Sequence, residues 1–265
     1  PYPIDASLTM LKDIDNLILV GTKAPVAFFA YPGKPSVLTT ASCRIHALCH
    51  PGEDVVQALE WLADDLGVRA ANPTVVQKED LVRPTGAITV DKLGQLLGAM
   101  SPEGAILVDE SNTSGRTFFS ATRAAKPHDL IHNLGGSIGY GLPVTIGASI
   151  ACPDRQVICL ESDGSALYTL QALWTQAREK TKVMTLLFSN RAYQILKGEL
   201  VNVGAANAGR KALDMMDLGN PDIDWVKMAA SMGVPGEHAT TMEELATAFE
   251  NGVKQNGPYL IEIIM

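Results

Sequence analysis

The stretch Val157-Ile158-Cys159-Leu160-Glu161-Ser162-Asp163-Gly164-Ser165 passes from an unbroken apolar run into small polar residues. Three more apolar runs of strand length occur at residues 105–108, 183–188 and 259–264, and helical patterns lie between them. Unbroken apolar strands that alternate with helices are typical of a parallel sheet covered on both faces. The sequence from residue 87 onward therefore predicts a doubly wound α/β domain.

The helical patterns of this domain cover residues 89–100, 166–177, 222–232 and 241–254. Thr240 and Glu243 have the spacing of a capping box at the start of the last one. Nearer the amino terminus, strands are predicted at residues 17–21, 26–30 and 36–39, followed by a helix over 53–66 that ends at Gly67. Residues 76–86 have no clear period and are predicted to be a linker, so the chain is expected to divide into domains at 1–75 and 87–265.

The composition argues against two classes of partner. The 265 residues carry a formal net charge of −8 and contain no cluster of basic residues. Nucleic acids and anionic membrane surfaces bind clustered Lys and Arg, so neither is expected as a partner. No apolar run approaches the length of a bilayer-spanning helix, and residues 1–10 do not resemble a signal peptide. The four cysteines form no CxxC pair, and we expect free thiols in a cytoplasmic protein.

Polar segments directly follow three of the predicted strands. They are residues 109–115, 161–165 and 189–193, which supply hydroxyls, carboxylates, amides and N–H groups at helix starts. Ligands of parallel α/β sheets bind beyond the carboxyl ends of the strands. These groups suit an anionic phosphate, with a hard cation bridging to carboxylate and amide oxygens. Each segment taken alone also fits ordinary turn and helix-cap chemistry.

The spacing of two of these segments is more specific. Asp163-Gly164-Ser165 is separated from Asn190 by one predicted helix and one predicted strand, and the Asp and the Asn lie 27 positions apart. This resembles the diphosphate-and-metal motif of thiamine-diphosphate-dependent enzymes. The glycine-rich stretch 135–143 is similar to that of acetolactate synthases and their relatives, and residues 163–175 are similar to benzoylformate decarboxylases. The resemblance identifies residues 87–265 as a carboxy-terminal cofactor-binding domain and, less specifically, residues 1–75 as part of a middle domain.

The resemblance implies a role for each residue that matches the motif. The Mg²⁺ ion would be bound by the side chains of Asp163 and Asn190 and by the backbone carbonyl of Ala192. The diphosphate of thiamine diphosphate would be bound by Asn112, Thr113, Gly164, Ser165 and the N–H groups near Tyr193.

The glycine-rich stretch would contact the rest of the cofactor. By resemblance, the Gly136 carbonyl would accept a hydrogen bond from the cofactor's amino group, and Ile138 would hold the cofactor in its bent form. Ile138 could equally be an ordinary core residue, and Asn112 and Thr113 could only cap a helix. His132 precedes the stretch and is either an acid–base group that faces the substrate or a structural histidine.

Two positions depart from the family pattern. Ser162 stands where the family usually has a glycine, and Ser189 where it often has an asparagine. Ser162 is acceptable there if its φ angle is negative. Relatives also use an activating glutamate from an amino-terminal domain of the partner subunit, and nothing in residues 1–265 resembles that domain. We therefore expect no catalytic glutamate in this chain, no activity from the chain alone, and a partner subunit in a homodimer or homotetramer.

The predicted function is a thiamine-diphosphate- and Mg²⁺-dependent carboligase or decarboxylase of 2-oxo acids, most similar to acetolactate synthase. A benzoylformate-type decarboxylase and a non-catalytic paralogue remain alternatives, because one fold hosts many reactions. The sequence leaves FAD binding open and carries nothing that indicates it. A nicotinamide dehydrogenase would need GxGxxG between a strand and a helix, whereas Gly136, Gly139 and Gly141 have that spacing reversed.

Overall fold

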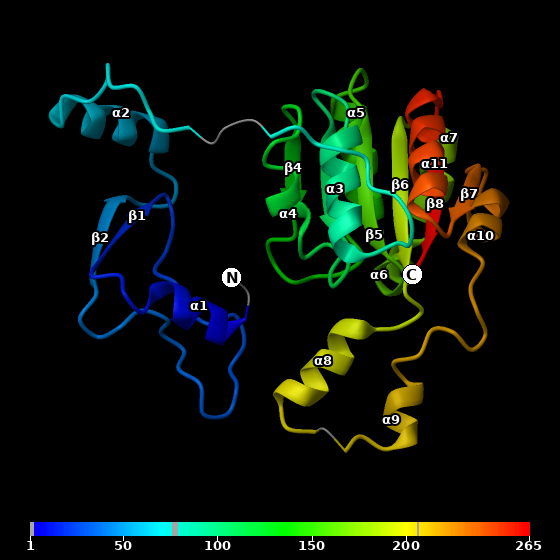
Figure 1. The fold of residues 1–265 in the computed structure, drawn as a ribbon, viewed down its shortest axis with the longest axis horizontal. Coiled ribbons are helices and arrows are strands. Elements are labelled where there is room, and N and C mark those ends of the chain that lie inside the picture. The colour runs from blue at the N-terminus through cyan, green and yellow to red at the C-terminus, as the bar shows by residue number, and fades with distance from the viewer. Residues whose placement is uncertain (1–2, 76–78, 206) are drawn as a thin grey trace. The chain divides into compact units, whose positions relative to one another are not determined.

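The computed structural model describes residues 3–75, 79–205 and 207–265, so residues 76–78 of the predicted linker lie outside the described part. The chain divides into two compact units (Figure 1). The first comprises residues 1–76 with 202–204, and the second comprises residues 77–201 with 205–265.

The first unit is a small α/β assembly. Its elements are the helix α1 (Ile4–Leu11), the strands β1 (Asn16–Val20) and β2 (Arg44–Cys49), and the helix α2 (Val55–Asp65). The two strands are parallel, with Asn16 opposite Arg44. The carboxylate of Asp54 caps α2 by accepting the Gln57 N–H at 2.9 Å.

Two strand predictions in this unit are wrong. Residues 26–30 and 36–39 form only a single antiparallel bridge, Val26 to Val37. Pro25 and Pro32 lie on either side of the first run and Pro35 directly precedes the second, and a proline has no N–H to donate to a ladder. The predicted strand at 17–21 and helix at 53–66 are confirmed as β1 and α2, whereas β2 was not predicted because its sequence mixes polar and apolar residues.

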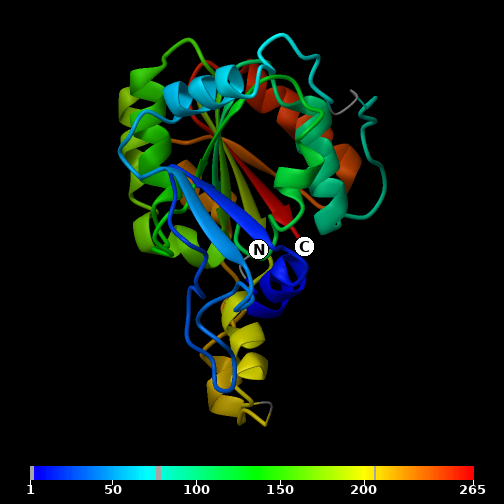
Figure 2. The same ribbon diagram turned by 90° about the vertical axis from the view of Figure 1, so that its left-hand side faces the viewer.

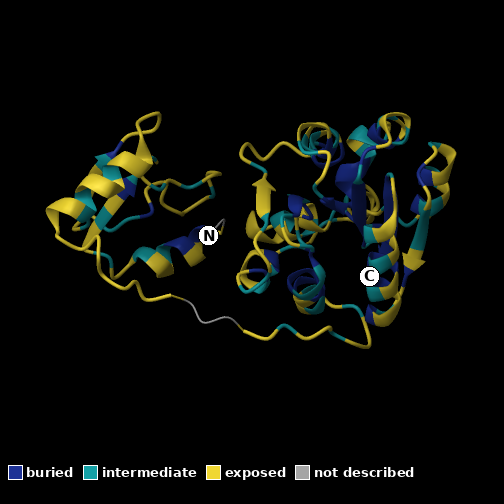
Figure 3. Cartoon of the chain, turned by 90° about the horizontal axis from the view of Figure 1, so that it is seen from above, coloured by how far each residue is buried: buried dark blue, intermediate teal, exposed yellow. Residues whose placement is uncertain are grey.

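The second unit contains a six-stranded sheet in which every pair of neighbouring strands is parallel. The strands are β3 (Ile106–Glu110), β4 (Asp129–His132), β5 (Val157–Ser162), β6 (Val183–Ser189), β7 (Gly236–Ala239) and β8 (Tyr259–Ile264). Their spatial order is β4-β3-β5-β6-β8-β7. Every residue of β5 and β6 is buried, which agrees with the mainly apolar sequence of these two strands. Figure 3 colours each residue of the chain by how far it is buried.

Helices cover both faces of this sheet (Figure 2). The helices packed around the sheet are α3 (Val90–Met100), α4 (Phe118–Ala121), α5 (Gly141–Ala151), α6 (Asp163–Thr169), α7 (Ala172–Glu179), α10 (Trp225–Ser231) and α11 (Met242–Lys254). Two further helices, α8 (Gln194–Asn202) and α9 (Arg210–Asp214), lie away from the faces of the sheet (Figure 1). One core cluster joins the sheet to α3 and α11, and a second joins its other face to α5, α7 and α10. The doubly wound architecture predicted from the sequence is thereby confirmed.

Two helix boundaries correct the sequence analysis. The helix predicted over 166–177 is two helices, because the chain leaves α6 after Thr169 and resumes at Ala172. The capping partner in α11 is Glu244 rather than Glu243: Thr241 is the N-cap and accepts the Glu244 N–H, while Glu244 accepts the Thr240 N–H. The predicted capping box was one residue too early, because two threonines and two glutamates are adjacent in this stretch.

The strand order places the functional region of the sheet. From β3 the chain crosses to β4 on one side and then to β5 on the other, so the connections diverge between the neighbouring strands β3 and β5. Ligands of open α/β sheets bind at such a divergence, beyond the carboxyl ends of the strands. Among the described residues, no helix is both long enough and apolar enough to span a membrane.

Candidate functional site

Asp163 lies at the carboxyl end of β5, as the first residue of α6, and is only 3% exposed. One carboxylate oxygen accepts the Gly164 N–H at 2.8 Å, and the other accepts the Arg191 N–H at 2.6 Å. In the described part of the chain no Lys or Arg side chain pairs with it, and the Arg191 guanidinium lies 3.4 Å from Asp222 instead. Burial raises the pKa of Asp163 to about 6, although the backbone N–H groups oppose the shift. The site therefore holds a desolvated carboxylate that a cation would stabilise.

Asn190 follows β6, the strand beside β5, with Ser162 opposite Phe188 in the register. Its side-chain oxygen accepts the Ala192 N–H at 3.0 Å. Arg191 has a φ of 56°, and this left-handed turn directs its N–H to Asp163. The backbone N–H of Asn190 is also near enough to Asp163 to oppose the rise in its pKa. The three residues predicted to hold a metal thus come from one strand end and the turn that folds over it.

Asn112 brings the end of β3 into the same region. Its Nδ2 donates to the Ser162 hydroxyl at 2.8 Å and to the Ser165 hydroxyl at 2.9 Å. Its φ of 49° is a conformation that Asn adopts more readily than most residues. The helix-cap alternative for Asn112 and Thr113 is wrong, because the next helix begins only at Phe118 and has Thr117 at its N-cap.

Ser162 fits the position that is usually glycine in the family pattern. Its φ is −90°, so the backbone does not require a glycine there. Its hydroxyl donates to the Ser165 hydroxyl at 2.9 Å. The substitution therefore adds a hydroxyl to the polar cluster without straining the chain.

The ring of Tyr193 leaves no room for a side chain at Gly164. A Cβ at position 164 would lie 2.7 Å from two ring carbons of Tyr193, closer than real Cβ contacts come. The Tyr193 N–H donates to the Met216 carbonyl at 3.0 Å, so it is already used within the chain. The packing of glycine against tyrosine joins the start of α6 to the turn after β6.

The glycine-rich segment is organised by Asn133. Its side-chain oxygen accepts the N–H groups of Gly135 at 3.0 Å and Gly136 at 2.7 Å, and its Nδ2 donates to the Ser137 carbonyl at 2.7 Å. Gly136 has a φ of 67°, which favours glycine. Ile138 is 41% exposed, so the alternative that it is a core residue is wrong.

His132 lies at the end of β4, opposite Asp109 of β3. Its side chain is 65% exposed, and its Nδ1 is 3.6 Å from an Asp109 carboxylate oxygen. The imidazole is therefore held beside an acid and open to solvent.

Two buried glutamates were not identified as site residues from the sequence. Glu110 ends β3 and Glu161 lies within β5; they are 3% and 0% exposed. Burial is the largest cause of the raised pKa of each, and their mutual repulsion adds to the rise for Glu161. For Glu161, an acidic residue within a largely apolar strand was the signal in the sequence that could have revealed it, whereas Glu110 lies at the end of its strand and had no such signal.

A second cluster of possible ligand atoms lies where α10, β7 and β8 meet. His238 Nε2 is 3.6 Å from Asp224 Oδ1 and 3.3 Å from Glu262 Oε2. Asp224 also caps α10 and lies 2.8 Å from the Lys227 ammonium, while Glu262 accepts the Trp225 N–H at 3.0 Å. These bonds fasten α10 to the sheet, and we interpret the cluster as structural.

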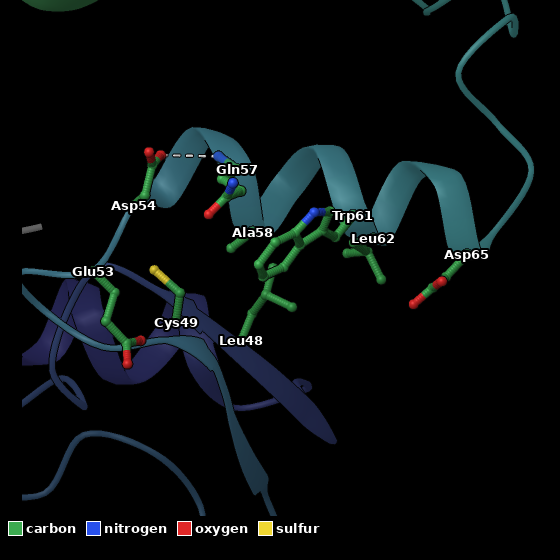
Figure 4. Close-up of a pocket in the computed structure, with 9 residues that line it drawn as sticks. All are labelled: Leu48, Cys49, Glu53, Asp54, Gln57, Ala58, Trp61, Leu62 and Asp65. Carbon is green, nitrogen blue, oxygen red and sulfur yellow. Dashed lines mark hydrogen bonds between the residues drawn. The ribbon is translucent and has the colours of Figure 1, made fainter.

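A cavity of about 460 Å³ lies between β2 and α2 in the first unit (Figure 4). Trp61 and Leu48 form its apolar part, and none of its lining residues is among the predicted site residues. Two of its acids are engaged locally: Asp54 caps α2, and Glu53 accepts the His50 N–H at 2.6 Å.

Comparisons with known proteins agree with this geometry. Residues 113–263 match the family model of the thiamine pyrophosphate enzyme C-terminal TPP binding domain. The chain is 44% identical, over all 265 residues, to a putative acetolactate synthase large subunit (IlvX) of Mycobacterium tuberculosis, of which it covers 51%. It is 28% identical to the benzoylformate decarboxylase of Pseudomonas aeruginosa, over 97% of this chain and 50% of that protein.

A solved structure has the same fold over almost the whole chain. The thiamine diphosphate-dependent 4-hydroxybenzoylformate decarboxylase of Rhodococcus jostii RHA1 superposes with a TM-score of 0.80 at 28% identity, covering 99% of this chain and 51% of that one. The chain thus spans about half the length of the relatives that it matches. The matched family model and the sheet with its switch-point site together show that this chain belongs to the thiamine pyrophosphate enzyme family, whose cofactor, thiamine diphosphate, is typically bound with Mg²⁺.

Proposed function

We propose that this chain forms the diphosphate- and metal-binding half of a thiamine-diphosphate-dependent enzyme that acts on 2-oxo acids. Its 44% identity to a putative acetolactate synthase large subunit favours carboligation. In that reaction a 2-oxo acid loses carbon dioxide and the remaining acyl unit is joined to a second carbonyl compound.

The donor set fits the cofactor. Asp163 offers a buried carboxylate without a cationic side chain in the described residues, and Asn190 and Ala192 offer amide and carbonyl oxygens in the adjoining turn. Oxygen ligands of this kind suit Mg²⁺, which keeps diphosphate oxygens and water in its remaining positions. Gly164 and Tyr193 shape the same edge of the site.

The diphosphate would lie against the polar cluster of Asn112, Ser162 and Ser165, with Thr113 in the adjoining turn. Hydroxyl and amide donors at the end of a parallel sheet bind phosphate oxygens well. Beyond this cluster, the Gly136 carbonyl and the exposed Ile138 side chain would position the cofactor's rings.

When bound, thiamine diphosphate supplies the electron sink for decarboxylation, and the protein supplies binding and orientation. The residues of this chain would bind the diphosphate, hold the metal and exclude water. His132, beside Asp109 and open to solvent, is the proposed proton carrier on the substrate side.

The buried, cation-free carboxylate of Asp163 carries this proposal, and removing it is the test. Asp163→Asn should lower the affinity for thiamine diphosphate in the presence of Mg²⁺ by about 100-fold or more, since loss of a group that merely supports a ligand costs about 10- to 100-fold. Asn190→Ala should weaken binding in the same direction. Calorimetric titration with Mg²⁺ and with a chelator measures both effects.

The exposed Asp154→Asn provides a matched control that should leave binding unchanged. Equal cofactor affinity in wild type and Asp163→Asn, or binding that does not depend on Mg²⁺, would contradict the proposal.

A benzoylformate-type decarboxylase is the second candidate, favoured by the 0.80 TM-score to a 4-hydroxybenzoylformate decarboxylase. Product analysis of the full-length protein with pyruvate and with benzoylformate separates the two reactions. An acetolactate-type product supports carboligation, and an aromatic aldehyde supports the alternative. A non-catalytic paralogue is less favoured, because Ser162 joins the polar cluster rather than disrupting it.

We further propose that the activating glutamate comes from outside these residues, in an amino-terminal domain of a partner subunit. The chain spans about half the length of its relatives, which supports this. Residues 1–265 alone should then give no turnover of pyruvate with thiamine diphosphate and Mg²⁺, and turnover by this chain would refute it. A cytoplasmic location is proposed from the four free cysteines.

A further inference from the structure

Glu110 joins two parts of the molecule that are far apart in sequence. It ends β3 and is 3% exposed. One carboxylate oxygen accepts the N–H of Gly139 and the other accepts the N–H of Gly141. A single buried side chain thus fastens the end of the glycine-rich segment to the central sheet.

The glycines at both positions are required by this arrangement. A Cβ at Gly141 would lie 2.8 Å from a Glu110 carboxylate oxygen and would overlap one of Glu161. Gly139 has a φ of 90°, and a Cβ there would lie 2.7 Å from the Tyr168 Cβ. The Gly139 carbonyl in turn accepts a hydrogen bond from the Thr169 hydroxyl at 2.8 Å. The segment is therefore held closely on both sides at this point.

Asn133 fixes the other end of the segment through Gly135, Gly136 and Ser137. Between the two anchors lie the Gly136 carbonyl and the Ile138 side chain, the groups that would meet the cofactor's rings. Both are exposed, so their own packing does little to define their positions. Their geometry depends on the anchors.

Glu110 also reaches the diphosphate side of the site. The Ser165 hydroxyl is near enough to the Glu110 carboxylate to lower its pKa, against the larger rise from burial, while the same hydroxyl accepts from Asn112 and Ser162. One carboxylate thereby links the surface for the rings to the surface for the diphosphate.

We propose that Glu110 is a positioning residue for the cofactor, which holds residues 136–139 in their binding geometry without touching the cofactor itself. The inference rests on the function proposed above. A carboxylate is needed because it offers two acceptor oxygens to two N–H donors, whereas a glutamine offers one acceptor and one donor group. Buried N–H donors that lose their acceptor destabilise the segment that carries them.

The test compares Glu110→Gln and Glu110→Asp with the exposed control Glu103→Gln in the full-length protein. Hydrogen–deuterium exchange reports on the N–H groups of residues 135–141, and calorimetry gives the affinity for thiamine diphosphate at saturating Mg²⁺. Glu110→Gln should raise exchange in this segment and lower the affinity, each by about tenfold, in line with an orphaned buried donor. Exchange in β6 and α11 should not change.

Glu110→Asp keeps the charge and both acceptors but is one methylene shorter. It is the second variant in case Glu110→Gln fails to fold, and it should give an intermediate loss of affinity with the same local rise in exchange. If either folded variant binds the cofactor as tightly as the wild type, or leaves exchange of residues 135–141 unchanged, Glu110 does not act as proposed. Failure of the wild type and the Glu103 control to bind the cofactor would instead refute the function proposed for the chain.

Discussion

At the scale of single residues, the site combines carboxylates in surroundings that disfavour their charge. Asp163, Glu110 and Glu161 all have raised pKa values, and burial is the largest cause in each case. A metal next to Asp163 would reverse that preference by favouring the ionised form. In the cofactor-free protein, ionisation of Asp163 should therefore lower the free energy of unfolding. In the loaded protein the metal would stabilise the same ionised carboxylate.

The pH dependence of stability tests this for Asp163. Unfolded, the carboxyl titrates near 3.8, and folded near 6. Between these values the folded state binds more protons, so the free energy of unfolding falls as the pH rises through this window. The Asp163→Asn variant lacks this contribution, and its stability relative to wild type should rise by on the order of 2 kcal/mol between about pH 4 and about pH 7.

Urea unfolding of the cofactor-free protein across this range measures the difference. Glu110 and Glu161 are present in both proteins, so their contributions largely cancel. If the free energy of unfolding depends on pH in the same way in the variant and the wild type, the pKa of Asp163 is not raised.

The contact between Gly164 and Tyr193 gives a second residue-scale prediction. In Gly164→Ala the added methyl would lie 2.7 Å from the tyrosine ring, which has to move. We expect a loss of about 1–3 kcal/mol in the free energy of unfolding, the usual cost of overpacking, together with weaker cofactor binding. Gly147→Ala is the control, because Gly147 lies in α5 with open space around it and should gain up to about 1 kcal/mol. Equal stabilities for the two variants would contradict the close packing at Gly164.

At the scale of elements, the N-cap of α11 lies one residue later in the chain than the sequence analysis predicted. Thr241 accepts the Glu244 N–H at 3.2 Å, and Glu244 accepts the Thr240 N–H at 2.8 Å. Thr241→Ala should cost about 1 kcal/mol of unfolding free energy. Thr247→Ala, an exposed change in the middle of the same helix, should be nearly neutral, and chemical denaturation compares the two. A larger loss of unfolding free energy for Thr247→Ala than for Thr241→Ala would show that Thr241 does not cap α11.

At the scale of the whole molecule, the predicted site belongs to the second of two compact units. A ligand that binds only the folded state stabilises it by about 2.7 kcal/mol at 100 times its Kd. Thiamine diphosphate with Mg²⁺ should therefore raise the Tm, whereas either component alone should raise it much less. Calorimetric scans with and without a chelator measure this, with Asp163→Asn as the variant that should not respond. An equal rise in Tm with the chelator present would contradict a metal-dependent site.

The sequence by itself determined the fold class, the core strands β3, β5, β6 and β8, and the family. Apolar runs alternating with helices have few arrangements other than a covered parallel sheet. The Asp163 to Asn190 spacing is the length of α6, α7 and β6, which connect the ends of the neighbouring strands β5 and β6. It also placed Asn112, Gly136 and Ile138 in segments that lie at the end of that sheet. It failed for β4 and β7, which are short edge strands with little of the burial that leaves a pattern in sequence.

Only the tertiary structure decided which of these groups meet and in what state. Glu110 and Gly139 are hydrogen-bonded although they are 29 positions apart, and Asn112 bonds Ser165 across 53. Composition and periodicity report on local conformation and burial, whereas the protonation of a carboxylate and the anchoring of a loop depend on which distant N–H groups reach it. Those distances are set when the strands take their order in the sheet, and for that reason Glu110 became recognisable as part of the site only in the folded chain.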